Sequence, residues 1–252
     1  QFESKGLALF FSNDIYPTSA DGTMPFVQAT DIFYLSGVDQ EETILLLFPD
    51  AHSDVDKEIL FTIETSEELA VWHGAKLTKQ EARESTGIRN VQWLSAFEST
   101  LHRLMAEAEL LYLNDNPHTR ASTLVETREL RENTRIREKY PNHITERTAP
   151  LLYDLRAVKH KTEILQMQRA CDITKAGLER VLQFVKPGVM EYEIEAEFLH
   201  EFIRRGSRRF AYTPIVGSGA NACVLHYVEN NKECKAGDVV LMDVGAEYGN
   251  YA

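Results

Sequence analysis

Asp243 is the residue whose type and position most clearly suggest chemistry. It directly follows the apolar run 239–242, which predicts a buried β-strand. A carboxylate at the end of a buried strand loses its hydration, so it needs a cation or several hydrogen-bond donors in compensation. The sequence therefore makes Asp243 a candidate metal ligand, with an ordinary turn cap as the alternative interpretation.

His226 is the second candidate, in an apolar segment, 223–227, that we predict to be a strand. An imidazole near a metal can serve as a ligand, move a proton, or donate to a developing oxyanion. A lone histidine between apolar neighbours is also an ordinary core residue, so the pattern leaves both interpretations open.

A two-residue hairpin turn is predicted at Gly249-Asn250, between two tyrosines. In that register, the position two residues past Ala252 would share a sheet face with Asp243. A carboxylate there would let two strands offer oxygens to one or two hard metal ions. Because the sequence starts at Gln1 and ends beside this turn, we expect the chain to be a fragment.

The elements that must position these residues fall into two groups. The first half alternates strands and helices, which indicates an α/β domain with a mixed or parallel sheet. We predict strands at 6–11, 31–36, 43–48, 59–63, 91–94 and 110–113, and helices from Thr65, at 78–85, at 97–109 and at 122–138. The dense alternating charge of the last of these helices predicts a solvated surface helix with i,i+4 ion pairs.

A break near 141–157 indicates a domain junction, which gives domains at 1–150 and 151–252. Beyond it we predict two helices and three strands. The helices begin at a Thr162 cap and at Glu191, and the strands lie at 210–216, 223–227 and 239–246.

Composition excludes some classes of function. The net charge of −12, from 27 basic and 39 acidic residues, argues against a nucleic-acid-binding surface. No apolar run is long enough for a membrane span, and no signal segment opens the chain. The three scattered cysteines form no disulfide or zinc pattern and favour a reducing, cytoplasmic location.

Short motifs in the second half resemble one metallopeptidase family. They are YTPIVGSG at 212–219, LHY at 225–227 and LMDVGAEY at 241–248, with a similar lead-in at 156–159 and 186–193. Together they closely resemble the metallopeptidases with the pita-bread fold, above all the Xaa-Pro aminopeptidases and Xaa-Pro dipeptidases. More loosely, FYLSGV at 33–38 and VWHG at 71–74 resemble the small N-terminal domain of the creatinase and prolidase type.

The resemblance implies an α/β (α+β) chain with a mixed-sheet N-terminal domain followed by the first part of a pita-bread catalytic domain. It implies that Asp243 is the first of five ligands to two divalent ions, usually Mn²⁺. His226 would assist the reaction beside the substrate, and Tyr212 would lie near the metal-bound water. Trp72 matches a position that can reach a neighbouring subunit's active site, which makes a homodimer or higher homo-oligomer plausible.

The implied reaction of the full-length protein is release of the N-terminal residue from peptides with proline second. The other four ligands would lie past Ala252, so we expect this chain alone to bind no catalytic metal and to be inactive. Three alternatives stay open: an Xaa-Pro dipeptidase, a non-catalytic peptidase-like module that binds proteins, and a metal-free creatinase-type hydrolase. The presence of Asp243 counts against the last two.

Overall fold

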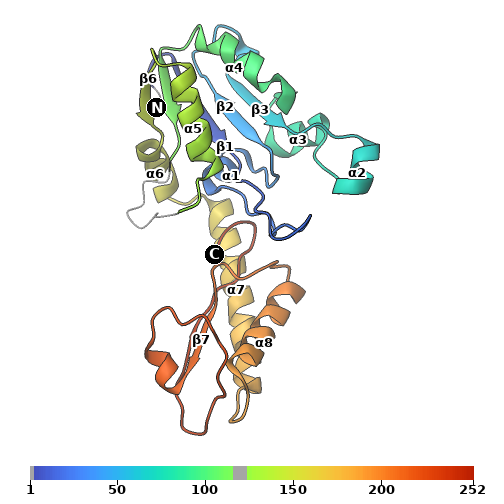
Figure 1. The fold of residues 1–252 in the computed structure, drawn as a ribbon, viewed down its shortest axis with the longest axis vertical. Helices are drawn as coiled ribbons and strands as arrows, with labels where there is room; N and C mark the ends of the chain where they lie inside the picture. The colour runs from blue at the N-terminus through green and yellow to red at the C-terminus, as the bar shows by residue number, and fades with distance from the viewer. Residues whose placement is uncertain (1–2, 116–123) are drawn as a thin grey trace. The chain divides into compact units, whose positions relative to one another are not determined.

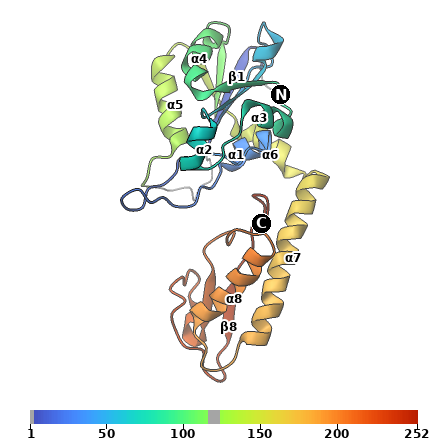
Figure 2. The same cartoon turned by 90° about the vertical axis from the view of Figure 1, so that its right-hand side faces the viewer.

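The computed structural model describes residues 3–115 and 124–252, which form two compact units, 1–157 and 158–252 (Figures 1 and 2). The boundary that the sequence suggested, at 150/151, falls inside helix α6 (Ala149–Ala157). Residues 122 and 123 of the helix predicted at 122–138 lie outside the described residues.

In the described part of the first unit, six strands form one sheet. In chain order they are β1 (Gly6–Phe11), β2 (Ile44–Leu47), β3 (Glu58–Thr62), β4 (Asn90–Trp93), β5 (Leu110–Leu113) and β6 (Ile144–Arg147). Their order in the sheet is β4-β3-β2-β1-β5-β6. The β1–β2 and β2–β3 pairs are antiparallel and the other three pairs are parallel. The predicted mixed sheet is therefore confirmed.

The central strand β1 is buried on both of its faces. Leu7, Leu9 and Phe11 pack with helices α4 (Phe97–Met105) and α5 (Arg128–Lys139). Ala8 and Phe10 pack on the opposite face, with α1 (Thr30–Ser36), α3 (Lys79–Thr86) and α6. Because successive side chains of a strand point to opposite faces, two covered faces require the unbroken apolar sequence that β1 has.

Residues 31–36, predicted as a strand, form helix α1 instead. A short apolar run fits a strand or a buried helix equally well by periodicity alone. Here Ile32 and Ser36, four residues apart, are the buried residues of the helix. Gly37 ends the helix in the left-handed conformation (φ 73°) and donates its N–H to the Phe33 carbonyl oxygen.

Other short elements were not predicted. Edge strand β6 and helix α6 occupy the stretch that the sequence suggested as an irregular junction, and all four residues of β6 are exposed, so they carry no apolar signal. By contrast, the helix predicted from Thr65 is confirmed as α2 (Glu67–His73), which begins at a Ser66 cap. Single 3₁₀ turns lie at Asp54–Asp56, Leu94–Ala96 and Gly219–Cys223.

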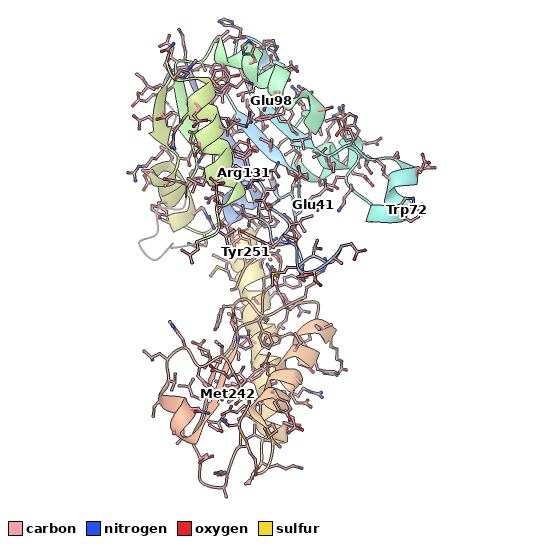
Figure 3. All side chains as sticks on the ribbon, in the orientation of Figure 1. Glu41, Trp72, Glu98, Arg131, Met242 and Tyr251 are labelled. Atoms are coloured by element: carbon pink, nitrogen blue, oxygen red, sulfur yellow. The ribbon has the colours of Figure 1, made fainter. Side chains whose placement is uncertain are left out.

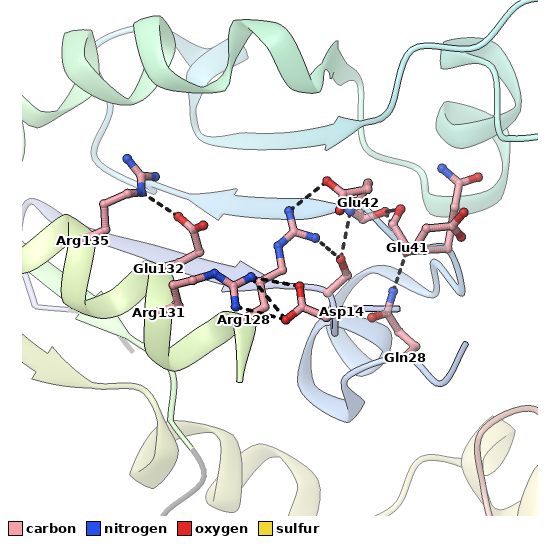
Figure 4. Close-up of polar contacts among 11 residues, drawn as sticks. Asp14, Gln28, Glu41, Glu42, Arg128, Arg131, Glu132 and Arg135 are labelled. Atoms are coloured by element: carbon pink, nitrogen blue, oxygen red, sulfur yellow. Dashed lines mark hydrogen bonds and ion pairs between the residues drawn. The ribbon is translucent and has the colours of Figure 1, made fainter. Parts of the chain in front are cut away.

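The charges of α5 bind distant partners rather than only solvent (Figure 4). Arg131 contacts both carboxylate oxygens of Asp14, at 2.9 and 3.2 Å. Arg128 is buried and donates to Ser12 Oγ at 2.7 Å. The prediction of a solvated helix with i,i+4 pairs is wrong for these two residues, because sequence spacing reports on neighbours within a helix and not on the loop packed against it.

In the second unit, helices α7 (Lys161–Phe184) and α8 (Glu191–Arg204) pack on a two-stranded antiparallel sheet of β7 (Ile215–Ser218) and β8 (Val240–Asp243). The core of this unit includes Ile173, Val181, Ile194, Phe198, Phe202 and Val216. Helix α7 is capped at His160, two residues before the predicted Thr162. No helix in the described ranges is long and apolar enough to cross a membrane.

The predicted hairpin turn at Gly249-Asn250 is confirmed. Both residues have positive φ, 57° and 63°, as a two-residue turn of this kind requires. Tyr248 and Tyr251 exchange backbone hydrogen bonds of 2.8 and 3.1 Å across the turn. Tyr251 is labelled in Figure 3.

Candidate active site

Asp243 ends strand β8, where it pairs with Ile215 of β7. Val240 and Met242 of this strand pack on the core of the second unit, and Figure 3 labels Met242. Leu241 and Asp243 point to the other face and are exposed. The prediction of a buried strand is thus wrong for Leu241 and Asp243, since α7 and α8 cover one face of β8 and no described residue buries the other. The desolvation argument for Asp243 does not apply here.

Tyr212 is the partner of Asp243. Its phenol oxygen donates to Asp243 Oδ1 at 2.8 Å. The backbone N–H of Ala211 donates to the Gly245 carbonyl oxygen at 2.8 Å, which brings the segment before β7 alongside the end of β8. A Cβ on Gly245 would lie 3.2 Å from Tyr212 Cε1, so the ring lies close against a residue without a side chain.

The environment of Tyr212 favours the neutral phenol. Partial burial raises the pKa of Tyr212, and the hydrogen bond to Asp243 and its negative charge raise it further. The phenol therefore stays a donor to Asp243 at neutral pH. The structure brings these two predicted site residues together.

His226 does not lie on a strand, so the predicted strand at 223–227 is wrong. Cys223 ends the 3₁₀ turn, and Leu225 and His226 form a second turn. Leu225 is 88% exposed, so the apolar residues that suggested a strand are not a packed face. His226 is also exposed, and its side chain forms no hydrogen bond with any residue that the structure describes.

Glu191 is a functional candidate that the sequence analysis did not single out. It is the first residue of α8 and is fully buried, at 0% exposure. Its carboxylate accepts four hydrogen bonds: from Ser218 N and Ser218 Oγ at 2.7 Å each, from Tyr227 Oη at 2.7 Å and from Lys232 N at 2.9 Å. An acidic residue in the first turn of a helix is usually explained by the helix dipole, and that pattern carries no signal of burial.

The ionisation of Glu191 follows from these donors. Burial by itself would raise the pKa of Glu191, but the hydrogen bonds from Tyr227, Lys232 and Ser218 outweigh it and lower the pKa. Glu191 is therefore a buried anion at neutral pH, stabilised by these hydrogen-bond donors.

Trp72 lies on α2 of the first unit and is 82% exposed; Figure 3 labels it. Its neighbour Val71 is 81% exposed. Two large apolar side chains are thus open to solvent on one short helix.

The metal-binding capacity of the described residues is limited. Within the ranges 3–115 and 124–252, no group of three or more His, Cys, Asp and Glu side chains could hold a metal ion. The oxygen ligands of Asp243 suit a hard divalent cation, but one carboxylate cannot hold a pair of ions. The described residues thus include the right type of ligand for such a centre, but too few ligands to hold it.

Two protein families match the chain. Residues 1–112 match the family described as "Aminopeptidase P, N-terminal domain" and residues 165–252 match "Metallopeptidase family M24". Metallopeptidases use a metal ion, usually to activate water and to polarise a carbonyl group.

Known proteins match over nearly the whole chain. The Xaa-Pro aminopeptidase of Escherichia coli is 32% identical over 256 residues, which is all of this chain and 57% of that protein. A candidate aminopeptidase P from Bacillus anthracis has a structure with a TM-score of 0.89 and 30% identity, over 98% of this chain and 59% of that one. Zinc-substituted Escherichia coli aminopeptidase P in complex with product has a TM-score of 0.82 and 30% identity, over 99% and 57%. The chain thus spans somewhat more than half the length of these relatives.

Proposed function

Because this chain carries an aminopeptidase P N-terminal domain followed by the start of an M24 metallopeptidase domain, we propose that the whole protein is an Xaa-Pro aminopeptidase. It would release the N-terminal residue from peptides that have proline in second position. The observation that carries this proposal is the 32% identity to the Escherichia coli Xaa-Pro aminopeptidase over the full length of the chain. The position of Asp243 at the end of β8, held by Tyr212, supports it.

The proposed metal centre is a pair of divalent ions, Mn²⁺ by preference, with Asp243 as one of five ligands. Tyr212 would fix the orientation of the Asp243 carboxylate by its hydrogen bond to Oδ1. Oδ2 of Asp243 accepts no hydrogen bond from a described residue. It would therefore be the oxygen that faces a cation. In the same proposal His226 lies beside the substrate and moves or donates a proton there. Its imidazole is exposed and has no hydrogen-bond partner among the described residues, so both nitrogens are available.

Location and partners are part of the proposal. We place the protein in the cytoplasm, acting on peptides, without a nucleic-acid or membrane partner. We also propose a homodimer or higher homo-oligomer in which Trp72 reaches the active site of a neighbouring subunit. The exposure of Trp72 and Val71 on α2 supports this, because a partner would cover two large apolar side chains.

The test is hydrolysis by the purified whole protein loaded with Mn²⁺. The substrates are an Xaa-Pro dipeptide, an Xaa-Pro tripeptide and a pentapeptide, with Ala in place of Pro in a matched pentapeptide as the control. Release of the first residue from the tripeptide and pentapeptide, and not from the Ala control, is the expected result. Cleavage of the dipeptide alone would instead identify an Xaa-Pro dipeptidase. No metal-dependent cleavage of any Xaa-Pro bond would overturn the proposal.

A further inference from the structure

The loop that carries His226 is fastened to the start of α8 by one buried carboxylate. Glu191 Oε1 accepts hydrogen bonds from the backbone N–H and the hydroxyl of Ser218, the last residue of β7. Glu191 Oε2 accepts hydrogen bonds from Tyr227 and from the backbone N–H of Lys232. The Glu191 side chain therefore binds Ser218 and Lys232, the residues on either side of the loop 219–231. It also binds Tyr227 within that loop.

The distal part of this loop has a second attachment. Asn230 is buried and accepts a hydrogen bond from Val216 N at 2.9 Å, while its amide nitrogen donates to the Pro214 carbonyl oxygen at 3.0 Å. Asn230 and Lys232 thus fix the end of the loop against β7 and α8. Neither residue is adjacent to His226 in the chain.

Tyr227 is the attachment nearest to His226. The two residues are consecutive but have opposite surroundings. Tyr227 is buried with its hydroxyl on Glu191, whereas the His226 side chain is exposed and bonds to none of the residues that the structure describes. The position of the His226 backbone therefore depends on the neighbouring Tyr227 contact. A hydrogen bond to a buried anion is stronger and shorter than one between neutral groups, so it can hold such a position.

We propose that Glu191 is a positioning residue for His226, acting through the hydroxyl of Tyr227. This inference rests on the proposed function, in which His226 acts on the substrate. In a reaction that needs a proton donor or acceptor at hydrogen-bonding distance, a displacement of about 1 Å costs on the order of a hundredfold in rate. Glu191 would keep the imidazole within that tolerance while remaining buried itself.

The first test is Tyr227→Phe in the whole protein, which removes one hydroxyl and leaves Glu191 with its three donors from Ser218 and Lys232. We expect kcat for an Xaa-Pro peptide to fall about tenfold with KM within about twofold, the size of loss that removal of one hydrogen bond to a charged group produces. Tyr192→Phe is the matched control, because Tyr192 is exposed on the same helix as Glu191. It should leave kcat unchanged.

The second test separates positioning from a general loss of structure. In a His226→Ala background, Tyr227→Phe should lower kcat no further, because the residue that it positions is absent. An equal fold loss in both backgrounds, or a wild-type kcat for Tyr227→Phe, would overturn the positioning role.

A third measurement does not depend on activity. Amide hydrogen exchange at residues 223–228 of the whole protein should be at least about fivefold faster in Tyr227→Phe than in Tyr192→Phe, with α7 and α8 unchanged. Unchanged exchange in the loop would refute the contribution of the Glu191–Tyr227 contact, whatever the protein cleaves. Failure of the wild-type protein to cleave Xaa-Pro peptides would count against the proposed function instead, and the exchange data would still decide whether Tyr227 holds the loop.

Discussion

The phenol oxygen of Tyr212 lies 2.8 Å from Oδ1 of Asp243, across 31 residues of sequence. The contact forms because β7 and β8 pair in the register that sets Ile215 opposite Asp243, and because Ala211 bonds to Gly245 just beyond that pair. A neutral hydroxyl thus holds one oxygen of an exposed carboxylate, and no described residue donates a hydrogen bond to the other. That arrangement orients the Asp243 carboxylate without neutralising its charge.

The Tyr212–Asp243 contact predicts how Tyr212 titrates. Asp243→Ala removes the acceptor and the negative charge, so the pKa of Tyr212 should fall toward its usual value. In the wild type, the stability that this contact adds is present below the pKa of tyrosine in the unfolded chain and is lost as pH rises through the higher folded value. NMR of ¹³Cζ-labelled tyrosine can follow the titration. Asp238→Ala, which removes a carboxylate that instead binds Lys235 N, is the control and should leave the pKa of Tyr212 unchanged.

A second pH effect is predicted in the first unit at Glu129. Burial, together with the negative charges of Asp31 and Asp115, raises the pKa of Glu129 to about 7, although a hydrogen bond from Asn114 opposes this. The folded state therefore binds a proton more tightly than the unfolded state does, so stability is lost as pH rises from about 4.5 to about 7.

The variant Glu129→Gln tests this because it is neutral at every pH. Its free energy of unfolding in urea should equal that of the wild type below pH 4.5. Above pH 7 it should exceed the wild-type value by at most about 3 kcal/mol. Glu126→Gln, at an exposed position in the segment just before α5, is the control. A difference between wild type and Glu129→Gln that does not change with pH would contradict the prediction.

Gly177 of α7 lies directly against two phenylalanine rings of α8. A Cβ at this position would lie 2.7 Å from Phe202 Cε1 and 2.9 Å from Phe198 Cδ1, and both rings are fully buried. Gly177→Ala should therefore destabilise the chain by about 1–3 kcal/mol, despite the better helix propensity of alanine. Denaturant unfolding measures the loss. Lys175→Ala, at an exposed position on the same helix, should change stability by less than about 0.5 kcal/mol.

The sequence predicted those elements whose local pattern and final environment agree. Strand β1 is apolar throughout and buried on both faces, so its pattern was sufficient. Helix α1 was predicted as a strand, because six residues do not distinguish the two periods. Edge strand β6 is wholly exposed, so it has no apolar pattern to detect.

The site shows the same limit. Asp243 and Tyr212 were singled out, but their contact depends on a register between segments far apart in sequence, which local patterns do not contain. Glu191 was missed for a similar reason: its burial is produced by Ser218, Tyr227 and Lys232, which approach it only in the folded chain. The sequence alone identifies the residue types at the site, but not the long-range pairing that brings them together.

The 252-residue chain by itself is predicted to bind no catalytic metal. Its described residues offer no group of three or more metal-binding side chains, and one exposed carboxylate binds a divalent ion only weakly. Calorimetric titration with Mn²⁺ and a peptidase assay of the purified chain on an Xaa-Pro peptide can check this. Manganese-dependent cleavage by this chain alone would show that the ligands are complete within it.

Gly245→Ala is predicted to disturb the candidate site without disturbing the fold. The added Cβ would lie 3.2 Å from Tyr212 Cε1 and 3.3 Å from its phenol oxygen, which is tighter than an ordinary van der Waals contact. Tyr212 is 48% exposed, so its ring can swing outward to relieve the contact rather than force the strands apart. The Tyr212 hydroxyl would then no longer donate its hydrogen bond to Asp243. In the whole protein we expect kcat/KM for an Xaa-Pro peptide to fall about tenfold, the loss that follows when a hydrogen bond orienting a metal ligand is removed.

The same variant of this chain separates a local from a global effect. The pKa of Tyr212 should fall toward its usual value, as is also expected for Asp243→Ala. The thermal midpoint should change by no more than about 2 °C, because no buried group moves. Gly237→Ala is a poor control, since Gly237 has a φ of 90° that alanine resists. Ala220→Gly, at an exposed position in the 3₁₀ turn Gly219–Cys223, serves better. An unchanged Tyr212 titration in Gly245→Ala would contradict this prediction. The position of the ring would then not depend on the absence of a side chain at Gly245, and the Ala211–Gly245 backbone hydrogen bond alone would hold Tyr212 beside Asp243.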